Sequence, residues 1–283
     1  MIAKSWAKVN LGLIIHSQRE DGYHEIETVM QQIGLCDYLE FQENNNEIEV
    51  TTVGGGIPEK DNLVYKAAVL LQQNYSISQG IKVNVYKNIP IGAGLGGGSG
   101  NAAVALAGLC KKWKVNLSLE DLFGIAERLG ADVPFFLMGG TVLAKGKGEK
   151  LKSLPQLPFF GVVLARPCGL SISTGEIYNK ISLNIPPAKI SYDGFINSLK
   201  AKDKKAILNW MARENMNMFE EVILKDYPSL FHLKDLFKKI GLTPIISGSG
   251  PSVFAMTSTL KNAMEAANFL EQFGYQAWAS WTL

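Results

Sequence analysis

Residues 90–101 read Pro90-Ile91-Gly92-Ala93-Gly94-Leu95-Gly96-Gly97-Gly98-Ser99-Gly100-Asn101. So many glycines are unfavourable inside a helix or a strand, because glycine loses the most backbone freedom on folding. Glycine does allow a positive φ and a close approach of backbone amides to a ligand. Before this stretch, residues 81–86 alternate apolar and polar side chains, which predicts a half-buried strand. After it, residues 101–109 are rich in Ala and Leu, which favours a helix.

A strand, a glycine loop and a helix N-terminus together favour a phosphate site, because unpaired N–H groups and the positive end of the helix dipole meet there. A flexible glycine hairpin is the alternative interpretation. The P-loop pattern, Gly and four residues followed by Gly-Lys-Ser/Thr, does not occur in the chain. Residues 92–97 match the letters of the dinucleotide fingerprint, but residues 88–91 separate them from the preceding strand, so the required βαβ context is missing.

The composition is that of an ordinary globular protein, with 283 residues, 47% hydrophobic and 19% charged. This length suits two domains, and the Pro-rich residues 154–158 are the candidate boundary. We therefore expect an N-terminal domain over 1–156 and a C-terminal domain over 157–283.

Charge and cysteine usage narrow the class of partner. The net charge of +2 and the absence of a basic cluster predict no nucleic-acid partner. Three widely separated cysteines favour neither a disulfide framework nor a zinc site, and they fit a reducing compartment. No apolar run has the length of a membrane span, and the chain enters a predicted strand too early for a signal peptide, so we expect a cytoplasmic protein.

Periodicity also predicts the other elements. We expect strands over 25–32, 39–52 (with a turn at 44–46), 157–164, 244–246, 252–256 and 275–281, and helices over 117–129, 174–180, 192–199, 204–210, 217–224, 229–240 and 261–273.

The first predicted strand, residues 7–15, carries Lys8, Asn10 and Gly12 on one face and apolar side chains on the other. A polar face of this kind is either the solvent side of the strand or a functional surface. The next polar feature is Asp21-Gly22-Tyr23-His24, in which the Asp-Gly pair predicts a turn that directs Tyr23 and His24 outward. These two rings either recognise a ligand or pack locally.

Asp132 lies between Gly130, which ends one predicted helix, and Pro134, which suits the first turn of the next. Helix capping would explain this acid. Its neighbours at 135–137 are apolar, however, and a half-buried carboxylate in such surroundings needs a partner or a task.

These features together resemble the GHMP kinases, a superfamily of small-molecule kinases without a P-loop. Residues 90–101 resemble the family's phosphate loop, and Ser247-Gly248-Ser249-Gly250 resembles its C-terminal glycine motif. Residues 6–11, 19–24 and 130–134 are similar to one group within the family, which phosphorylates the 2-hydroxyl of a cytidine diphosphate-linked polyol in the non-mevalonate route to isoprenoid precursors. The Asp-Gly-Tyr-His element separates that group from mevalonate, homoserine and galactose kinases.

The resemblance implies an α+β fold of two domains, the N-terminal one ribosomal-protein-S5-like and the C-terminal one ferredoxin-like. It implies ATP and Mg²⁺ as cofactors, a small-molecule substrate, and a monomer or weak homodimer. Lys8 and Asp132 would be the catalytic pair, with Asp132 accepting the proton of the attacking hydroxyl. The amides of the loop would bind the ATP phosphates, with Ser99 near Mg²⁺. The implied ATP-binding residues are Pro90, Ile91, Gly92, Ala93, Gly94, Leu95, Gly96, Gly97, Gly98, Ser99 and Gly100, with Asn62 and Lys87 near the adenosine.

On the substrate side, the resemblance implies that Tyr23 and Tyr178 sandwich the cytosine and that His24 reads its polar edge. Asn10 and Thr174 would lie near the polyol. Relatives commonly carry two serines where this chain has Ser99-Gly100, which leaves open how the phosphate or Mg²⁺ shell is completed. Two alternatives stay open: another GHMP kinase with a different acceptor, and a catalytically silent nucleotide-binding protein of the same fold.

Overall fold

The computed structural model describes residues 1–45, 47–181, 191–213 and 216–283. Two compact units are present. The first unit contains residues 1–7, 35–91 and 96–139, and the second contains residues 8–34, 92–95 and 140–283. The two long strands β1 (Ile2–Gln18) and β2 (His24–Asn44) contribute residues to both units. The domain boundary after residue 156 stays a prediction.

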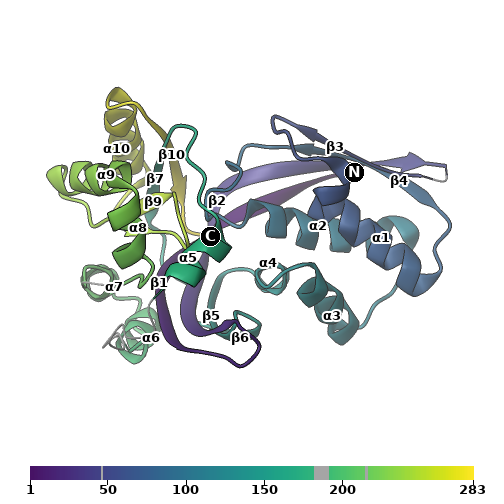
Figure 1. The fold of residues 1–283 in the computed structure, drawn as a ribbon, viewed down its shortest axis with the longest axis horizontal. Coiled ribbons are helices and arrows are strands. Elements are labelled where there is room, and N and C mark those ends of the chain that lie inside the picture. Colours follow the sequence, from purple (N-terminus) through teal and green to yellow (C-terminus); the bar gives the residue numbers. More distant parts are fainter. Residues whose placement is uncertain (46, 182–190, 214–215) are drawn as a thin grey trace. The chain divides into compact units, whose positions relative to one another are not determined.

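The first unit has a sheet covered by helices. In it β3 runs parallel to β4, and β4 runs antiparallel to Tyr38–Asn44 of β2. Figure 1 shows the α-helices of this unit on one side of β3 and β4. The elements are β3 (Ile48–Val53), a 3₁₀ turn (Glu59–Asp61), α1 (Leu63–Tyr75), β4 (Gly80–Tyr86), α2 (Gly97–Trp113), α3 (Leu119–Leu129) and α4 (Val133–Met138).

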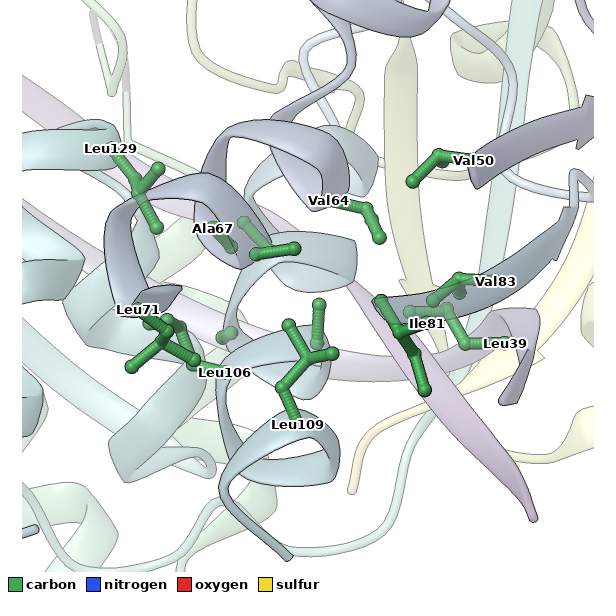
Figure 2. Close-up of a cluster of buried hydrophobic side chains, with 14 of the residues drawn as sticks. Leu39, Val50, Val64, Ala67, Leu71, Ile81, Val83, Leu106, Leu109 and Leu129 are labelled. Atoms are coloured by element: carbon green, nitrogen blue, oxygen red, sulfur yellow. The ribbon is translucent and has the colours of Figure 1, made fainter. Parts of the chain in front are cut away.

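Local sequence explains where these helices begin. Asn62 caps α1 by accepting a hydrogen bond from the Val64 amide, and Ser118 caps α3 in the same way. The apolar faces of α1 and α2 then pack on the strands, and Figure 2 shows the side chains that meet there. A Leu→Ala substitution at a buried position of this kind typically costs about 2–5 kcal/mol of stability.

The second unit contains an antiparallel sheet in the order β10–β7–β9–β8. Helices α9 and α10 pack on β7 and β9, and Figure 1 shows them beside that sheet. A separate set of pairings joins residues 26–31 of β2 to β5 and β5 to β6. The elements are β5 (Thr141–Gly146), β6 (Lys150–Ser153), β7 (Gly161–Pro167), α5 (Thr174–Lys180), α6 (Asp193–Lys200), α7 (Lys204–Met211), α8 (Glu220–Asp226), α9 (Pro228–Lys239), β8 (Ile245–Ile246), β9 (Val253–Thr257), α10 (Leu260–Gln272) and β10 (Tyr275–Trp281).

Several predicted elements have different bounds in the structure, and the first strand, predicted at 7–15, runs from Ile2 to Gln18. The strands predicted at 25–32 and 39–52 are one continuous strand to Asn44, followed by a separate β3. Strand β7 begins at Gly161 and not at Leu157, and Phe159 is 49% exposed. Helix α2 begins at Gly97, earlier than the predicted residue 101, because glycine costs little in a first turn whose amides have no intrahelical partner. In the part of the chain that the structure describes, no helix has both the length and the apolar character needed to cross a membrane.

Candidate active site

The glycine loop adopts a conformation that requires glycine. Gly92, Gly94 and Gly96 all have positive φ, at 65°, 73° and 67°. A Cβ atom on Gly94 would lie 2.3 Å from the carbonyl oxygen of Ser247 and 2.9 Å from that of Gly250, both of which are backbone atoms. The loop and the Ser247–Gly250 turn therefore approach each other at a distance that no other residue at position 94 allows.

The loop ends at the N-terminus of α2. Gly96 is the N-cap residue, and the Gly100 amide donates the helical hydrogen bond to the Gly96 carbonyl at 2.8 Å. The amides of Gly97, Gly98 and Ser99 come before that bond, and the first turn contains no acidic residue. Backbone donors without side chains, at the positive end of a 17-residue helix, fit the phosphate groups of a nucleotide.

Position 100 faces β1. A Cβ on Gly100 would lie 2.9 Å from Ser5 Oγ and 3.0 Å from the Trp6 carbonyl oxygen. A side chain at position 100 would therefore point into the first unit.

A buried carboxylate that the sequence did not suggest as a site organises the segment before the loop. Asp37 on β2 is fully buried, and its Oδ1 accepts from the amides of Asn88 and Ile89, each at 2.8 Å. Its Oδ2 accepts from Asn101 Nδ2 at 3.0 Å and forms an ion pair with Lys87. Asp37 thus ties the end of β4 to the second turn of α2. The available signal was a single acid within an apolar strand segment.

Lys87 and Asn62 both have structural partners in the first unit. The Lys87 side chain is 4% exposed, and its ammonium lies 3.0 Å from where a Cβ on Gly97 would be. Asn62 caps α1 and also donates from Nδ2 to Thr52 Oγ1 at 3.0 Å. The adenosine contacts implied for these two residues stay predictions.

The polar face of β1 is buried, so the interpretation of that face as the solvent side is wrong. Lys8 is 5% exposed and Asn10 is 3% exposed. Lys8 Nζ donates to Asn10 Oδ1 at 2.6 Å, and the Lys8 amide donates to the carbonyl of Leu95 in the glycine loop at 3.0 Å. An ammonium held inside the protein beside a phosphate-type loop is suited to offset negative charge on a bound group.

The Ser247–Gly250 segment is a turn between β8 and β9, and it also contacts the same polar face. Ser247 Oγ donates to the Gly94 carbonyl at 3.0 Å and accepts from the backbone N–H of Asn10 at 3.3 Å. Buried Asn217, which the sequence did not suggest as a site residue, donates from Nδ2 to the carbonyl of Gly248 at 2.7 Å. The turn is thereby fixed against both the glycine loop and β1.

Tyr23 and His24 do not share one environment. Tyr23 is 58% exposed, in agreement with the predicted outward position. Lys147 Nζ lies 4.9 Å from the centroid of its ring. His24 is buried and stacks on Tyr178, with ring centroids 5.0 Å apart and an interplanar angle of 28°. The outward direction predicted for His24 is therefore wrong, because it begins β2 and its side chain turns inward. Burial lowers the pKa of the His24 imidazole below its ordinary value.

Asp132 and Thr174 stand at helix starts. Asp132 is the N-cap residue of α4, but its carboxylate makes no capping hydrogen bond to that helix, so capping does not explain it. The residue is half-buried. Thr174 begins α5, is exposed, and shares a hydrogen bond of 2.7 Å with Ser249 Oγ. Asp132 belongs to the first unit, whereas Thr174 and Lys8 belong to the second.

The described residues contain no group of three or more His, Cys, Asp or Glu side chains that could hold a metal ion. These residues fit a Mg²⁺ ion whose ligands are mostly phosphate oxygens and water, as is usual for nucleotide-bound Mg²⁺. Ser99, in the first turn of α2, is half-buried and could supply one hydroxyl.

Comparison with known proteins identifies the family. Residues 62–140 match the GHMP kinases N terminal domain and residues 195–276 match the GHMP kinases C terminal domain. The chain is 37% identical to a 4-diphosphocytidyl-2-C-methyl-D-erythritol kinase from Geobacillus sp. (strain WCH70), over 99% of this chain and 96% of the relative. It is 40% identical to the kinase of the same name from Pelotomaculum thermopropionicum, over 92% of this chain and 90% of the relative.

Solved structures agree with the sequence relatives. The crystal structure of a 4-(cytidine 5'-diphospho)-2C-methyl-D-erythritol kinase matches with a TM-score of 0.86 and 31% identity, over 100% of this chain and 99% of that one. The mevalonate kinase of Methanococcus jannaschii matches with a TM-score of 0.72 at 16% identity, over 100% and 98% of the two chains, and supports the fold alone. The predicted two-domain GHMP kinase fold is confirmed, and the chain belongs to the GHMP kinases and, within them, to the 4-diphosphocytidyl-2-C-methyl-D-erythritol kinase family.

Proposed function

We propose that this chain transfers the γ-phosphoryl group of ATP to the 2-hydroxyl of 4-diphosphocytidyl-2-C-methyl-D-erythritol, giving the 2-phosphate and ADP, in the non-mevalonate route to isoprenoid precursors. The observation that carries the proposal is the buried Lys8 ammonium, on a strand whose backbone bonds to the glycine loop at Leu95. A buried ammonium beside this loop can stabilise the negative charge of a bound phosphate group. The names of relatives that match along nearly the whole chain support the same activity.

In this mechanism most of the rate acceleration comes from positioning and electrostatics, because phosphoryl transfer requires little covalent work from the protein. The amides between Gly92 and Gly100 hold the phosphates, and Lys8 offsets charge on the transferring group. Asp132 takes the proton of the substrate hydroxyl as its oxygen attacks the γ-phosphorus, and the bond from phosphorus to the ADP oxygen breaks. A positioned base of this kind contributes about 10²- to 10⁴-fold.

Mg²⁺, when bound with ATP, would neutralise phosphate charge, and Ser99 is the residue of this chain proposed to contact it. At the other end of the substrate, we assign the cytosine to Tyr23 and Tyr178, with His24 at its polar edge. The stack of His24 on Tyr178 supports this assignment because it holds two of the three rings in place. Asn10 and Thr174 would contact the polyol.

The test is an ADP-release assay with a panel of cytidine diphosphate-linked polyols and free polyols, together with mevalonate, homoserine and galactose. We expect turnover with the cytidine-linked methylerythritol, and none with mevalonate, homoserine or galactose. Turnover with one of these three would favour another GHMP kinase activity. No turnover, despite nucleotide binding, would favour the catalytically silent alternative.

The general base is tested by Asp132→Asn, which keeps the shape of the side chain. We expect it to fold and to bind both substrates, with phosphoryl transfer reduced by at least about 10²-fold. Turnover like that of the wild type would remove Asp132 from the mechanism.

We further expect the protein to act in the cytoplasm as a monomer or weak homodimer. Light scattering at micromolar concentration checks the oligomeric state.

A further inference from the structure

Thr28 lies on β2 beside the polar face of β1, and its side chain is buried. Its hydroxyl oxygen accepts a hydrogen bond from Asn10 Nδ2 at 2.9 Å. The same hydroxyl donates to the Gly12 carbonyl oxygen at 2.5 Å. Thr28 is therefore connected to Lys8 by one intervening side chain, because Asn10 Oδ1 accepts from Lys8 Nζ at 2.6 Å.

These three hydrogen bonds have only one consistent direction. An ammonium group donates and never accepts, so the oxygen of the Asn10 amide has to face Lys8 and its NH₂ group has to face Thr28. The Thr28 oxygen then accepts, and its own proton is directed to Gly12, whose carbonyl can only accept. The ammonium thus sets the orientation of the Asn10 side-chain amide, and the Thr28 hydroxyl holds the NH₂ end of that amide in place.

We propose that Thr28 is a positioning residue that holds the Lys8 ammonium in place by fixing the orientation of the Asn10 amide. This inference rests on the proposed function, in which Lys8 acts on the transferring phosphoryl group. Without the Thr28 hydroxyl, the buried NH₂ group of Asn10 loses its acceptor, and of these two bonds only the one to Lys8 still holds the Asn10 amide. The Asn10 side chain can then shift, and the ammonium that its oxygen accepts from shifts with it.

The test compares Thr28→Val, which removes the hydroxyl but keeps the β-branched shape, with Thr28→Ser, which keeps the hydroxyl. Displacing a reacting group by about 1 Å can cost about 10²-fold in rate, so we expect kcat of Thr28→Val to fall by about ten- to hundredfold. We expect KM for ATP to be unchanged, because the phosphates bind to amides of the glycine loop. Thr28→Ser should restore kcat to nearly the value of the wild type.

A purely structural role for Thr28 is separated from the proposed one by a double-mutant cycle with Asn10→Ala. If Thr28 acts through Asn10, adding Thr28→Val to Asn10→Ala causes no further loss of kcat. An equal loss in both backgrounds, or an increase of KM for ATP to match the fall of kcat, would overturn the inference. If Thr28→Val is recovered unfolded, Thr28→Cys carries the same comparison, because a thiol is a weak donor and acceptor.

The outcomes also separate this inference from the activity on which it rests. A wild-type protein that phosphorylates no polyol in the panel refutes the proposed function itself. A wild-type protein that is active, together with a Thr28→Val variant of full activity, refutes the role of Thr28 and leaves the proposed function standing.

Discussion

Replacing Asp37 by Asn should destabilise the first unit strongly. The carboxylate is fully buried and accepts from two backbone amides, from Asn101 and from the Lys87 ammonium. An amide at position 37 can still accept from the two backbone amides through its oxygen. Its NH₂ group then faces the other two donors, and the Lys87 charge stays buried without its carboxylate.

Removing one partner of a buried ion pair costs about 3–5 kcal/mol, because an uncompensated charge stays inside the protein. For chains of about 150–250 residues, a loss of 1 kcal/mol in the free energy of unfolding lowers Tm by about 2–4 °C. We therefore expect Asp37→Asn to lower Tm by about 6–20 °C. Lys87→Met should cost less, about 1.5–3 kcal/mol, because Asp37 keeps three of its four donors.

The assay is thermal and urea denaturation followed by circular dichroism, on the wild type, both single variants and the double variant. The double variant Asp37→Asn/Lys87→Met leaves no buried charge, so it should be more stable than Asp37→Asn alone. A loss below about 1 kcal/mol for Asp37→Asn, or strictly additive single effects, would show that the ion pair does not hold the two segments together.

Three further predictions concern the glycine loop and the aromatic residues. Gly94→Ala should lower the stability of the protein, because φ of Gly94 is +73° and the added Cβ would lie 2.3 Å from a backbone oxygen. Gly98→Ala is the matched control, since the atom nearest to its added Cβ would be 3.8 Å away, and thermal melting compares the two variants. Tyr23→Ala should raise KM for the cytidine substrate, since a stacked ring contributes about 1–3 kcal/mol, and an equal effect on ATP would contradict the assignment. Burial lowers the pKa of His24, so the unfolded chain binds the proton more tightly and stability should fall as the pH drops below about 6.5, the ordinary His value. In His24→Phe this part of the pH dependence of Tm should disappear.

The sequence predicted the features that depend on neighbouring residues. The glycine loop, the two helices that follow the loop and most elements after residue 160 are determined by local composition and periodicity, and the structure contains them. The shift of the start of α2 to Gly97 is local too, because it reflects the tolerance of a first turn for glycine.

Only the tertiary structure decided which polar side chains are buried and what they contact. In the sequence, Lys8 lies on a strand face that is either exposed or functional, and Asp37 is a single acid in an apolar segment. Each is buried by segments more than forty positions away, as the bonds from Lys8 to Leu95 and from Asp37 to Asn101 show. Periodicity identifies two faces of a strand but not which face another segment covers. The cost of burying a polar group is offset by hydrogen-bond partners that folding brings from elsewhere in the chain, and local sequence patterns do not identify these partners.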